Sequence, residues 1–287
     1  MATARDLQAT RNSPADNPAG NHTGRPTSAD RRRQLGVTLA EVLCIYGTLL
    51  GVGVIGTRVE ESSGGALAAD ATLLAPATPA FSIWSVIYLG LAAYTIWQWL
   101  PANATSPRAR ATGWLIAVSM LLNAGWLLVT QQGWIWASVV IIVALALTLG
   151  VILARLTAIP PAPTGRTIQR VIVDGTMGLY LGWVAVATCA NITAALVATD
   201  VELAAPGADI VAVIVLAVAA GLGVLFARRL GGRYAVAAAM AWGLVWIAVG
   251  RTTDAPVSRL VTIGAVTAAV IVVLGAAAAR HPAARRG

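Results

Sequence analysis

Long apolar stretches alternate with short polar segments along most of this chain, and the pattern predicts membrane-spanning helices. A helix needs about 20 apolar residues to cross a hydrocarbon core of roughly 30 Å. Eight stretches reach or approach that length, and the segments between them are rich in Pro, Gly, Arg and acidic residues. They are residues 35–56, 81–100, 113–130, 134–156, 171–197, 210–227, 234–250 and 260–279. The expected fold class is an all-α, polytopic membrane helix bundle of about eight transmembrane helices.

The positions of the arginines predict which loops face the cytoplasm, because cytoplasmic loops retain positive charge. The chain contains no lysine, and its arginines gather before the first stretch and after the second, fourth, sixth and eighth. The intervening loops instead carry Glu60, Glu61, Asp70, Asp200, Glu202 and Asp209, with Arg58, Arg251 and Arg259 as their basic residues. The alternation predicts that both the N-terminus and the C-terminus are cytoplasmic.

The composition agrees with a membrane protein. Hydrophobic residues make up 57% of the chain and charged residues 11%, which a soluble domain of this length would not show. The formal net charge of +8 does not indicate nucleic-acid binding, since the arginines border the spans and no nucleic-acid-binding motif is visible. We expect a multi-pass protein of the cell membrane whose partner is the lipid bilayer and which binds no nucleic acid.

Aromatic and amide residues form stripes on three of the predicted helices. Residues spaced i, i+3, i+7 and i+11 share one helix face. By this spacing the stripes comprise Phe81, Trp84 and Tyr88, then Asn123 and Trp126, then Tyr180, Trp183, Ala187 and Asn191. Helical rise places Phe81, Trp84, Asn123, Trp126, Thr188 and Asn191 within about 15 Å of the outer surface. The stripes could therefore meet in one cavity in the outer half of the membrane.

Helix packing is the competing interpretation of these stripes. Trp and Tyr commonly anchor helices at both membrane interfaces, and Asn can hydrogen-bond a neighbouring helix. The tryptophans at span ends fit that explanation, and they are Trp97, Trp99, Trp114, Trp134 and Trp136. The sequence leaves a ligand cavity and pure packing open for the deeper residues.

Two acidic residues lie within predicted spans, where ionisable groups are costly and are candidates for function. Asp174 follows Arg170 by one helical turn, so a local ion pair or a snorkelled side chain explains it. Glu41 lies about two turns from Arg33, and interfacial pairing is again the simpler interpretation. A transport or proton-linked role for either acid is the alternative.

Little in the sequence points to catalysis. Cys44 and Cys189 fall within predicted spans, where small thiols are ordinary packing residues, and His22 and His281 lie outside the spans. The sequence contains no metal-ligand spacing, no phosphate-binding loop and no nucleophile motif. We expect no enzyme activity, no metal site and no required cofactor.

Three motifs resemble the tryptophan-rich sensory protein family, TspO/MBR, which includes the mitochondrial translocator protein once known as the peripheral benzodiazepine receptor. The motifs are PAFSIW at 79–84 with Tyr88, LNAGW at 122–126, and YLGWVAVATCAN at 180–191. The resemblance is best over residues 35–197, the first five predicted helices. Residues 57–80 depart from the family pattern, because compact members carry Trp and Pro-rich elements there that help to cover the ligand, and this chain has no Trp in the segment.

The resemblance implies a five-helix bundle whose pocket opens near the loop between the first two helices and accepts flat or bulky apolar ligands such as porphyrins and sterols. By motif matching, the ligand-binding positions are Phe81, Trp84, Tyr88, Asn123, Trp126, Tyr180, Trp183 and Asn191, and Thr188 lies beside them. A tetrapyrrole, either a porphyrin or haem, is a candidate ligand, and a homodimer is a candidate assembly.

These observations predict three regions: a disordered Arg-rich cytoplasmic tail at 1–34, a TspO-like five-helix core at 35–197, and a three-helix C-terminal membrane extension at 198–287. The predicted function is binding of a planar or bulky apolar molecule by stacking on Trp and Tyr faces. A small-solute or proton-coupled secondary transporter is the alternative. A further alternative is a structural or partner-binding membrane subunit that uses the last three helices as its contact surface.

Overall fold

The computed structural model describes residues 25–51, 54–201 and 206–284, and within these ranges the regular structure is helical and contains no strand. Eight of the helices there are long. They are α1 (Ser28–Gly51), α2 (Ile83–Trp97), α3 (Pro107–Gln131), α4 (Ile135–Ala158), α6 (Thr176–Val197), α7 (Gly207–Arg229), α8 (Tyr234–Thr253) and α9 (Arg259–Ala284). The short elements are η1 (Val59–Glu61), η2 (Ser63–Gly65), η3 (Thr78–Ser82), α5 (Arg166–Gln169) and the π-helical η4 (Arg170–Gly175).

The helices have the length and composition of membrane spans. Seven helical segments in the described ranges are long and apolar enough to cross a bilayer. The first helix, α1, is not among these seven segments. It still runs beside α3, since Gly36 lies against Trp114 and Gly47 lies against Ala124. The predicted fold class, an all-α multi-pass membrane helix bundle, is confirmed.

The start of α1 corrects the predicted extent of the N-terminal tail. The Asp30 backbone N–H donates to Thr27 Oγ1 at 3.2 Å, and the Thr27 N–H donates to Asp30 Oδ2 at 3.1 Å. This reciprocal arrangement is a capping box, which stabilises a helix beginning at the next residue. Residues 28–34, predicted as disordered, are therefore helical; residues 1–24 of the predicted tail lie outside the described part of the chain.

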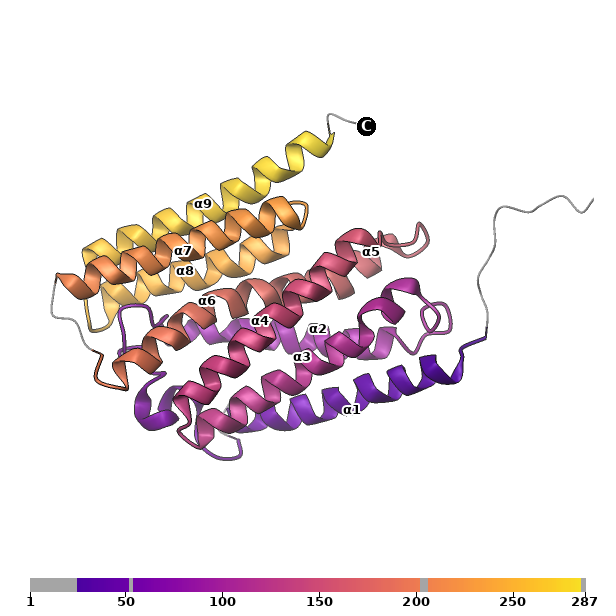
Figure 1. Cartoon of the computed structure of the whole chain (residues 1–287), viewed down its shortest axis with the longest axis horizontal. Helices are drawn as coiled ribbons and strands as arrows, with labels where there is room; N and C mark the ends of the chain where they lie inside the picture. Colours follow the sequence, from indigo (N-terminus) through magenta and orange to yellow (C-terminus); the bar gives the residue numbers. More distant parts are fainter. Residues whose placement is uncertain (1–24, 52–53, 202–205, 285–287) are drawn as a thin grey trace, which may run out of the picture.

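The long helices pack in an order that differs from their order in the sequence. Contacts run from α1 to α3, α4, α6, α8, α9 and finally α7, while α2 lies against α1, α6 and η4. Figure 1 shows α7, α8 and α9 together on one side of the bundle and α1 on the opposite side. The C-terminal helices thus meet the preceding helices mainly through the contact between α6 and α8.

Two glycines on α6 allow α8 to approach closely. A Cβ atom at Gly182 would lie 2.3 Å from the Val236 carbonyl oxygen, and one at Gly178 would lie 2.8 Å from the Ala235 Cβ. Glycines four residues apart let helix backbones approach in a membrane, where van der Waals packing drives association. The C-terminal helices are therefore docked on the core through a backbone-level contact.

Carboxylates hold the Arg-rich end of the bundle together. Asp30 accepts two hydrogen bonds from Arg110, at 2.8 and 2.6 Å, and one from Arg33 at 2.9 Å. The Arg110 guanidinium holds the pKa of the Asp30 carboxyl well below its usual range. Arginines expected on one side of the membrane thus meet at one end of the bundle; which side this end faces stays a prediction.

A second cluster joins α3, η4 and the residue just before α8 at the same end. Asp174 accepts hydrogen bonds from Arg108, at 3.0 and 2.6 Å, and from Arg233 at 2.6 Å. The local pair with Arg170 that the sequence suggested is wrong, since Asp174 sits in the π-helical turn η4 and bonds to neighbouring helices instead. Arg108 and Arg233 are far from Asp174 in sequence, so helical spacing could not reveal them.

Candidate functional site

The aromatic stripes meet at the end of the bundle opposite the two carboxylate clusters. Phe81 lies in η3, where Pro79 stands in the first turn, as proline prefers at a helix start. Trp84 and Tyr88 follow on α2, and Tyr180 and Trp183 face them from α6. The residues come together because α2 packs against α6.

The rings form a connected cluster with Trp84 at its centre. Trp84 stacks on Tyr88, with centroids 5.2 Å apart, and meets Tyr180 edge to face at 5.8 Å. Trp183 makes edge-to-face contacts with Trp84 at 6.2 Å and with Phe81 at 5.8 Å. These are favourable geometries for aromatic pairs, so the cluster provides a rigid apolar wall.

The two asparagines hold rings in place. Trp126 Nε1 donates to Asn191 Oδ1 at 3.0 Å, and Asn191 Nδ2 donates to Ser138 Oγ, also at 3.0 Å. Asn123 Nδ2 donates to the Tyr88 hydroxyl at 3.0 Å. Because both asparagines are buried, these bonds fix the positions of Trp126 and Tyr88.

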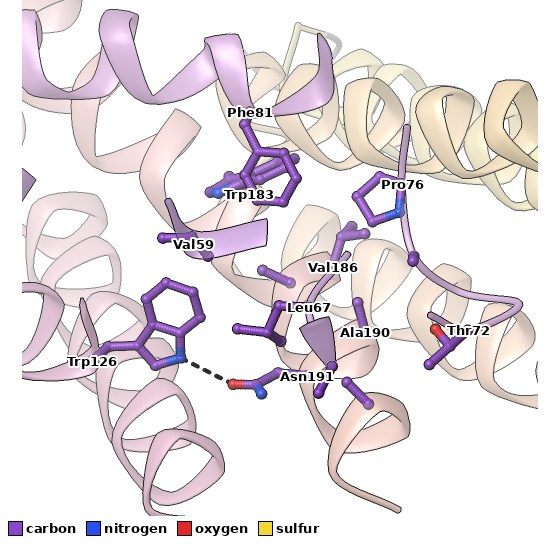
Figure 2. Close-up of a pocket in the computed structure, with 14 residues that line it drawn as sticks. Val59, Leu67, Thr72, Pro76, Phe81, Trp126, Trp183, Val186, Ala190 and Asn191 are labelled. Carbon is purple, nitrogen blue, oxygen red and sulfur yellow. Dashed lines mark hydrogen bonds between the residues drawn. The ribbon is translucent and has the colours of Figure 1, made fainter. Parts of the chain in front are cut away.

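A cavity lies between the α1–α2 loop and the helices α3 and α6, and we call it the inner cavity. It has an empty volume of about 540 Å³, part of which is open to solvent. Figure 2 shows Phe81 beside Trp183 on one side and Trp126 bonded to Asn191 on another. The lining residues are Val59, Ala66, Leu67, Thr72, Ala75, Pro76, Phe81, Trp126, Trp183, Val186, Ala187, Ala190, Asn191 and Ala194. The walls are almost entirely apolar, with Thr72 and Asn191 as polar side chains.

A second opening, the side cavity, lies among α1, α2, α3 and the start of the loop. Its empty volume is about 860 Å³, again partly open, and Phe81, Trp126 and Val59 line both cavities. Trp84, Ser85 and Tyr88 line it from α2, while Arg58 and Glu60 lie at its polar edge. A smaller space of about 310 Å³, lined by Trp84, Asn123 and Trp183 among others, lies next to both.

Seven of the predicted site residues therefore line these spaces: Phe81, Trp84, Tyr88, Asn123, Trp126, Trp183 and Asn191. Tyr180 lines none of them; it is fully buried against Trp84, and its hydroxyl donates to the Ser119 carbonyl at 3.2 Å. The Thr188 hydroxyl donates to the Val184 carbonyl of its own helix at 2.7 Å and lines none of the three spaces either.

The tryptophans assigned to membrane interfaces divide into two groups. Trp99, Trp114, Trp134 and Trp136 are exposed, as an interface anchor should be. Trp97 is only 3% exposed and stacks on Tyr94, so the interface assignment is wrong for this residue. The position of a tryptophan at the end of a predicted span does not show whether its ring packs inside the bundle or faces outward.

Sequence reasoning identified Ala187 but missed the loop residues and two other small residues of the inner cavity, Ala190 and Ala194. Val59, Leu67 and Pro76 from the loop supply apolar cover in place of tryptophan. Ala187, Ala190 and Ala194 on α6 leave the space beneath that cover. Ala190 and Ala194 follow Ala187 at i+3 and i+7, so they share the face of the predicted stripe, and this spacing was an available signal.

Glu41 does not form the expected pair with Arg33, which is bonded to Asp30. The Glu41 side chain lies on α1 and the residue is 5% exposed. Its Oε2 atom has no hydrogen-bond partner in the described part of the chain. An isolated buried carboxyl is costly, so this acid is not explained as an interfacial ion pair.

The arrangement is suited to binding. Aromatic rings, small apolar residues and two polar side chains line the inner cavity, a combination that is typical of small-molecule sites. Within the described residues, no group of three or more His, Cys, Asp or Glu side chains could hold a metal ion.

The family model described as "TSPO-like protein" matches residues 38–278, from α1 into α9. Searches of curated proteins and of solved structures give no match. The matched region extends beyond the five helices that the motifs cover and includes α7 and α8 entirely. More than half of the chain is covered, and the protein belongs to the TSPO-like family.

Proposed function

We propose that this membrane protein binds a planar or bulky, largely apolar small molecule, of tetrapyrrole or sterol type, in the inner cavity. The observation that carries the proposal is a cavity walled by Phe81, Trp126 and Trp183 at the loop-covered end of the bundle.

The proposed mechanism of binding is stacking on the ring faces that line the inner cavity, together with burial of apolar surface. Trp126 is held by Asn191, and Trp183 is held between Phe81 and Trp84, so neither ring loses much freedom when a ligand arrives. A preformed site of this kind lowers the entropic cost of binding. Thr72 and Asn191 are the polar groups that could orient a ligand with a polar edge.

We further propose that the protein resides in the cell membrane with both termini cytoplasmic, and that it acts by binding, without catalysis or a required cofactor. The ligand would then enter the site from the outer half of the bilayer or from the outside. A homodimer is the proposed assembly.

Titration of the purified protein in nanodiscs with protoporphyrin IX, haem and cholesterol tests this function. Trp126 and Trp183 line the cavity, so a bound tetrapyrrole should quench tryptophan fluorescence in a saturable way. Cholesterol should compete with it if sterols use the same cavity. Absence of saturable binding for all three probes would rule out the proposed ligand class.

Proton-coupled transport is the second candidate, and Glu41 is the observation that favours it. A buried carboxyl without a hydrogen-bond partner in the described residues is the kind of group that carries protons in transporters. Uptake of a solute into liposomes under an imposed pH gradient would distinguish transport from binding alone.

A further inference from the structure

We propose that α8 holds residues 69–80, the loop segment that covers the inner cavity, in place. Arg251 and Trp242 on α8 are then positioning residues for the bound ligand. The inference rests on the proposed function of the cavity. It gives the C-terminal helices a role in ligand binding, although neither Arg251 nor Trp242 lines the inner cavity.

Arg251 is attached to the loop between α1 and α2. The residue is fully buried near the end of α8, and its guanidinium donates from Nη1 to the Thr72 carbonyl at 2.6 Å and from Nη2 to the Ala69 carbonyl at 2.7 Å. Hydrogen bonds from a charged donor are short and strong, and they gain further from a low-dielectric surrounding. The guanidinium thus fixes two points of loop backbone to one helix.

Two more bonds attach the following part of the same loop. Trp242 Nε1 donates to the Ala80 carbonyl at 2.9 Å, and the Ala77 backbone N–H donates to the Trp246 carbonyl at 3.1 Å. Gly250 lies so close that a Cβ atom there would be 3.2 Å from the Ala77 nitrogen. Residues 69–80 are therefore tied to α8 at both ends and near the middle.

The tied segment is also the cover of the cavity. Thr72, Ala75 and Pro76 line the inner cavity, and Phe81 follows directly after Ala80. Thr72 connects the two features in a single residue, because its carbonyl accepts from Arg251 while the residue lines the cavity. A ligand that leaves under this cover must displace backbone that α8 holds, so the Arg251 bonds should slow ligand dissociation.

The other end of α8 supplies a matched control. Arg233, just before α8, bonds to Asp174 at 2.6 Å in the carboxylate cluster at the opposite end of the bundle. Arg251→Met and Arg233→Met each remove a guanidinium that anchors α8, and both should lower the thermal midpoint. Only Arg251→Met removes the loop anchors.

The experiment measures dissociation of protoporphyrin IX from the full chain in nanodiscs by stopped-flow recovery of tryptophan fluorescence. Arg251→Met should raise the dissociation rate about tenfold, as expected when a residue outside the site contributes to coupling, while Arg233→Met leaves the rate unchanged. Arg251→Lys, which keeps one charged donor, should give an intermediate rate. Equal rates in the two methionine variants would overturn the proposal.

Two further measurements decide the matter if Arg251→Met does not fold or if protoporphyrin IX does not bind. Trp242→Phe removes a single donor, to Ala80, and should raise the dissociation rate about threefold. Without any ligand, a thiol introduced by Ala75→Cys in a Cys44→Ala, Cys189→Ala background should react faster with a maleimide when Trp242→Phe or Arg251→Met is added. Absence of wild-type binding would count against the ligand, whereas unchanged thiol reactivity would refute the role of α8.

Discussion

The two ends of this bundle are built in opposite ways. At one end Asp30 and Asp174 are each shared by two arginines from different segments, and the helices close together around these carboxylates. At the other end the buried Arg251 bonds to loop carbonyls instead, and cavities lie beneath the loop. The same type of side chain locks helices together at one end and positions a cover at the other.

Helix α6 shows how one segment serves both ends. The π-helical turn η4, which directly precedes α6, places Asp174 in the carboxylate cluster. The C-terminal half of α6 places Ala187, Ala190 and Ala194 along the inner cavity. The difference suggests that the charged end provides stability while the loop end provides binding. Substitutions at the two ends should therefore change different quantities.

The largest expected effect concerns which end faces outside, because thiol labelling is all or none. Thr252 lies at the loop end and Ala162 at the Arg-rich end, and both are exposed. In sealed cells an impermeant maleimide should label Thr252→Cys and leave Ala162→Cys unlabelled, since Arg-rich loops stay cytoplasmic. The unsubstituted protein provides the background, because Cys44 is buried and Cys189 only partly exposed. The reverse labelling pattern would invert the topology without changing the fold.

The next largest effect should come from breaking the charged end. Asp174→Asn leaves Arg108 and Arg233 without their shared carboxylate, and the Arg108 side chain is only 3% exposed. Removing one partner of a buried ion pair typically costs about 3–5 kcal/mol, so thermal unfolding in detergent should show a large loss of stability. The affinity of the folded fraction for protoporphyrin IX should stay the same.

Asp200→Asn is the control for this change, since Asp200 is an exposed acid outside the cluster. It should leave both stability and affinity close to those of the unsubstituted protein. If Asp174→Asn weakened binding as strongly as it weakened folding, the separation of the two ends would be wrong.

A smaller effect is expected on affinity at the loop end. Trp183→Leu keeps apolar bulk but removes the broad ring face that lines the cavity, so protoporphyrin IX should lose about 1 kcal/mol or more, roughly fivefold in Kd. Fluorescence or absorbance titration measures this loss.

Trp99→Leu is the matched control, because Trp99 is exposed at the Arg-rich end and bonds to Thr38 at 2.9 Å. This variant should bind with unchanged affinity. Equal losses in the two variants, or none in either while binding persists, would place the ligand outside the inner cavity.

Much of the fold was predictable because the bilayer imposes it. Apolar stretches of about 20 residues must be helices, so their number and approximate bounds follow from the sequence. The start of α1 was missed because its capping box, Thr27 and Asp30, stands before a run of arginines that reads as polar tail. The pairing of Asp174 with Arg108 and Arg233 was missed because it depends on the order in which helices pack.

The helix part of the candidate site was predictable, and the loop part was not. Trp84, Tyr88, Trp126 and Trp183 lie on faces that helical spacing identifies. The cover of the cavity comes from irregular backbone around Thr72, whose position depends on Arg251 far along the chain. No periodicity links a loop to a helix that reaches it through backbone carbonyls, so only the structure reveals that contact.

The smallest expected effect concerns Glu41, which lies between the two ends on α1. Its Oε2 atom has no hydrogen-bond partner in the described residues, so Glu41→Gln breaks no recorded bond and removes a charge that is costly to bury. We expect the stability to change by no more than about 1 kcal/mol, measured by thermal unfolding, and the protoporphyrin IX affinity to stay the same. Glu60→Gln is the control, since Glu60 lies at the polar edge of the side cavity. The prediction is contradicted if Glu41→Gln abolishes pH-driven uptake into liposomes while the protein stays folded and Glu60→Gln does not. The protein would then be a proton-coupled transporter. The middle of the bundle would carry a function that neither end provides.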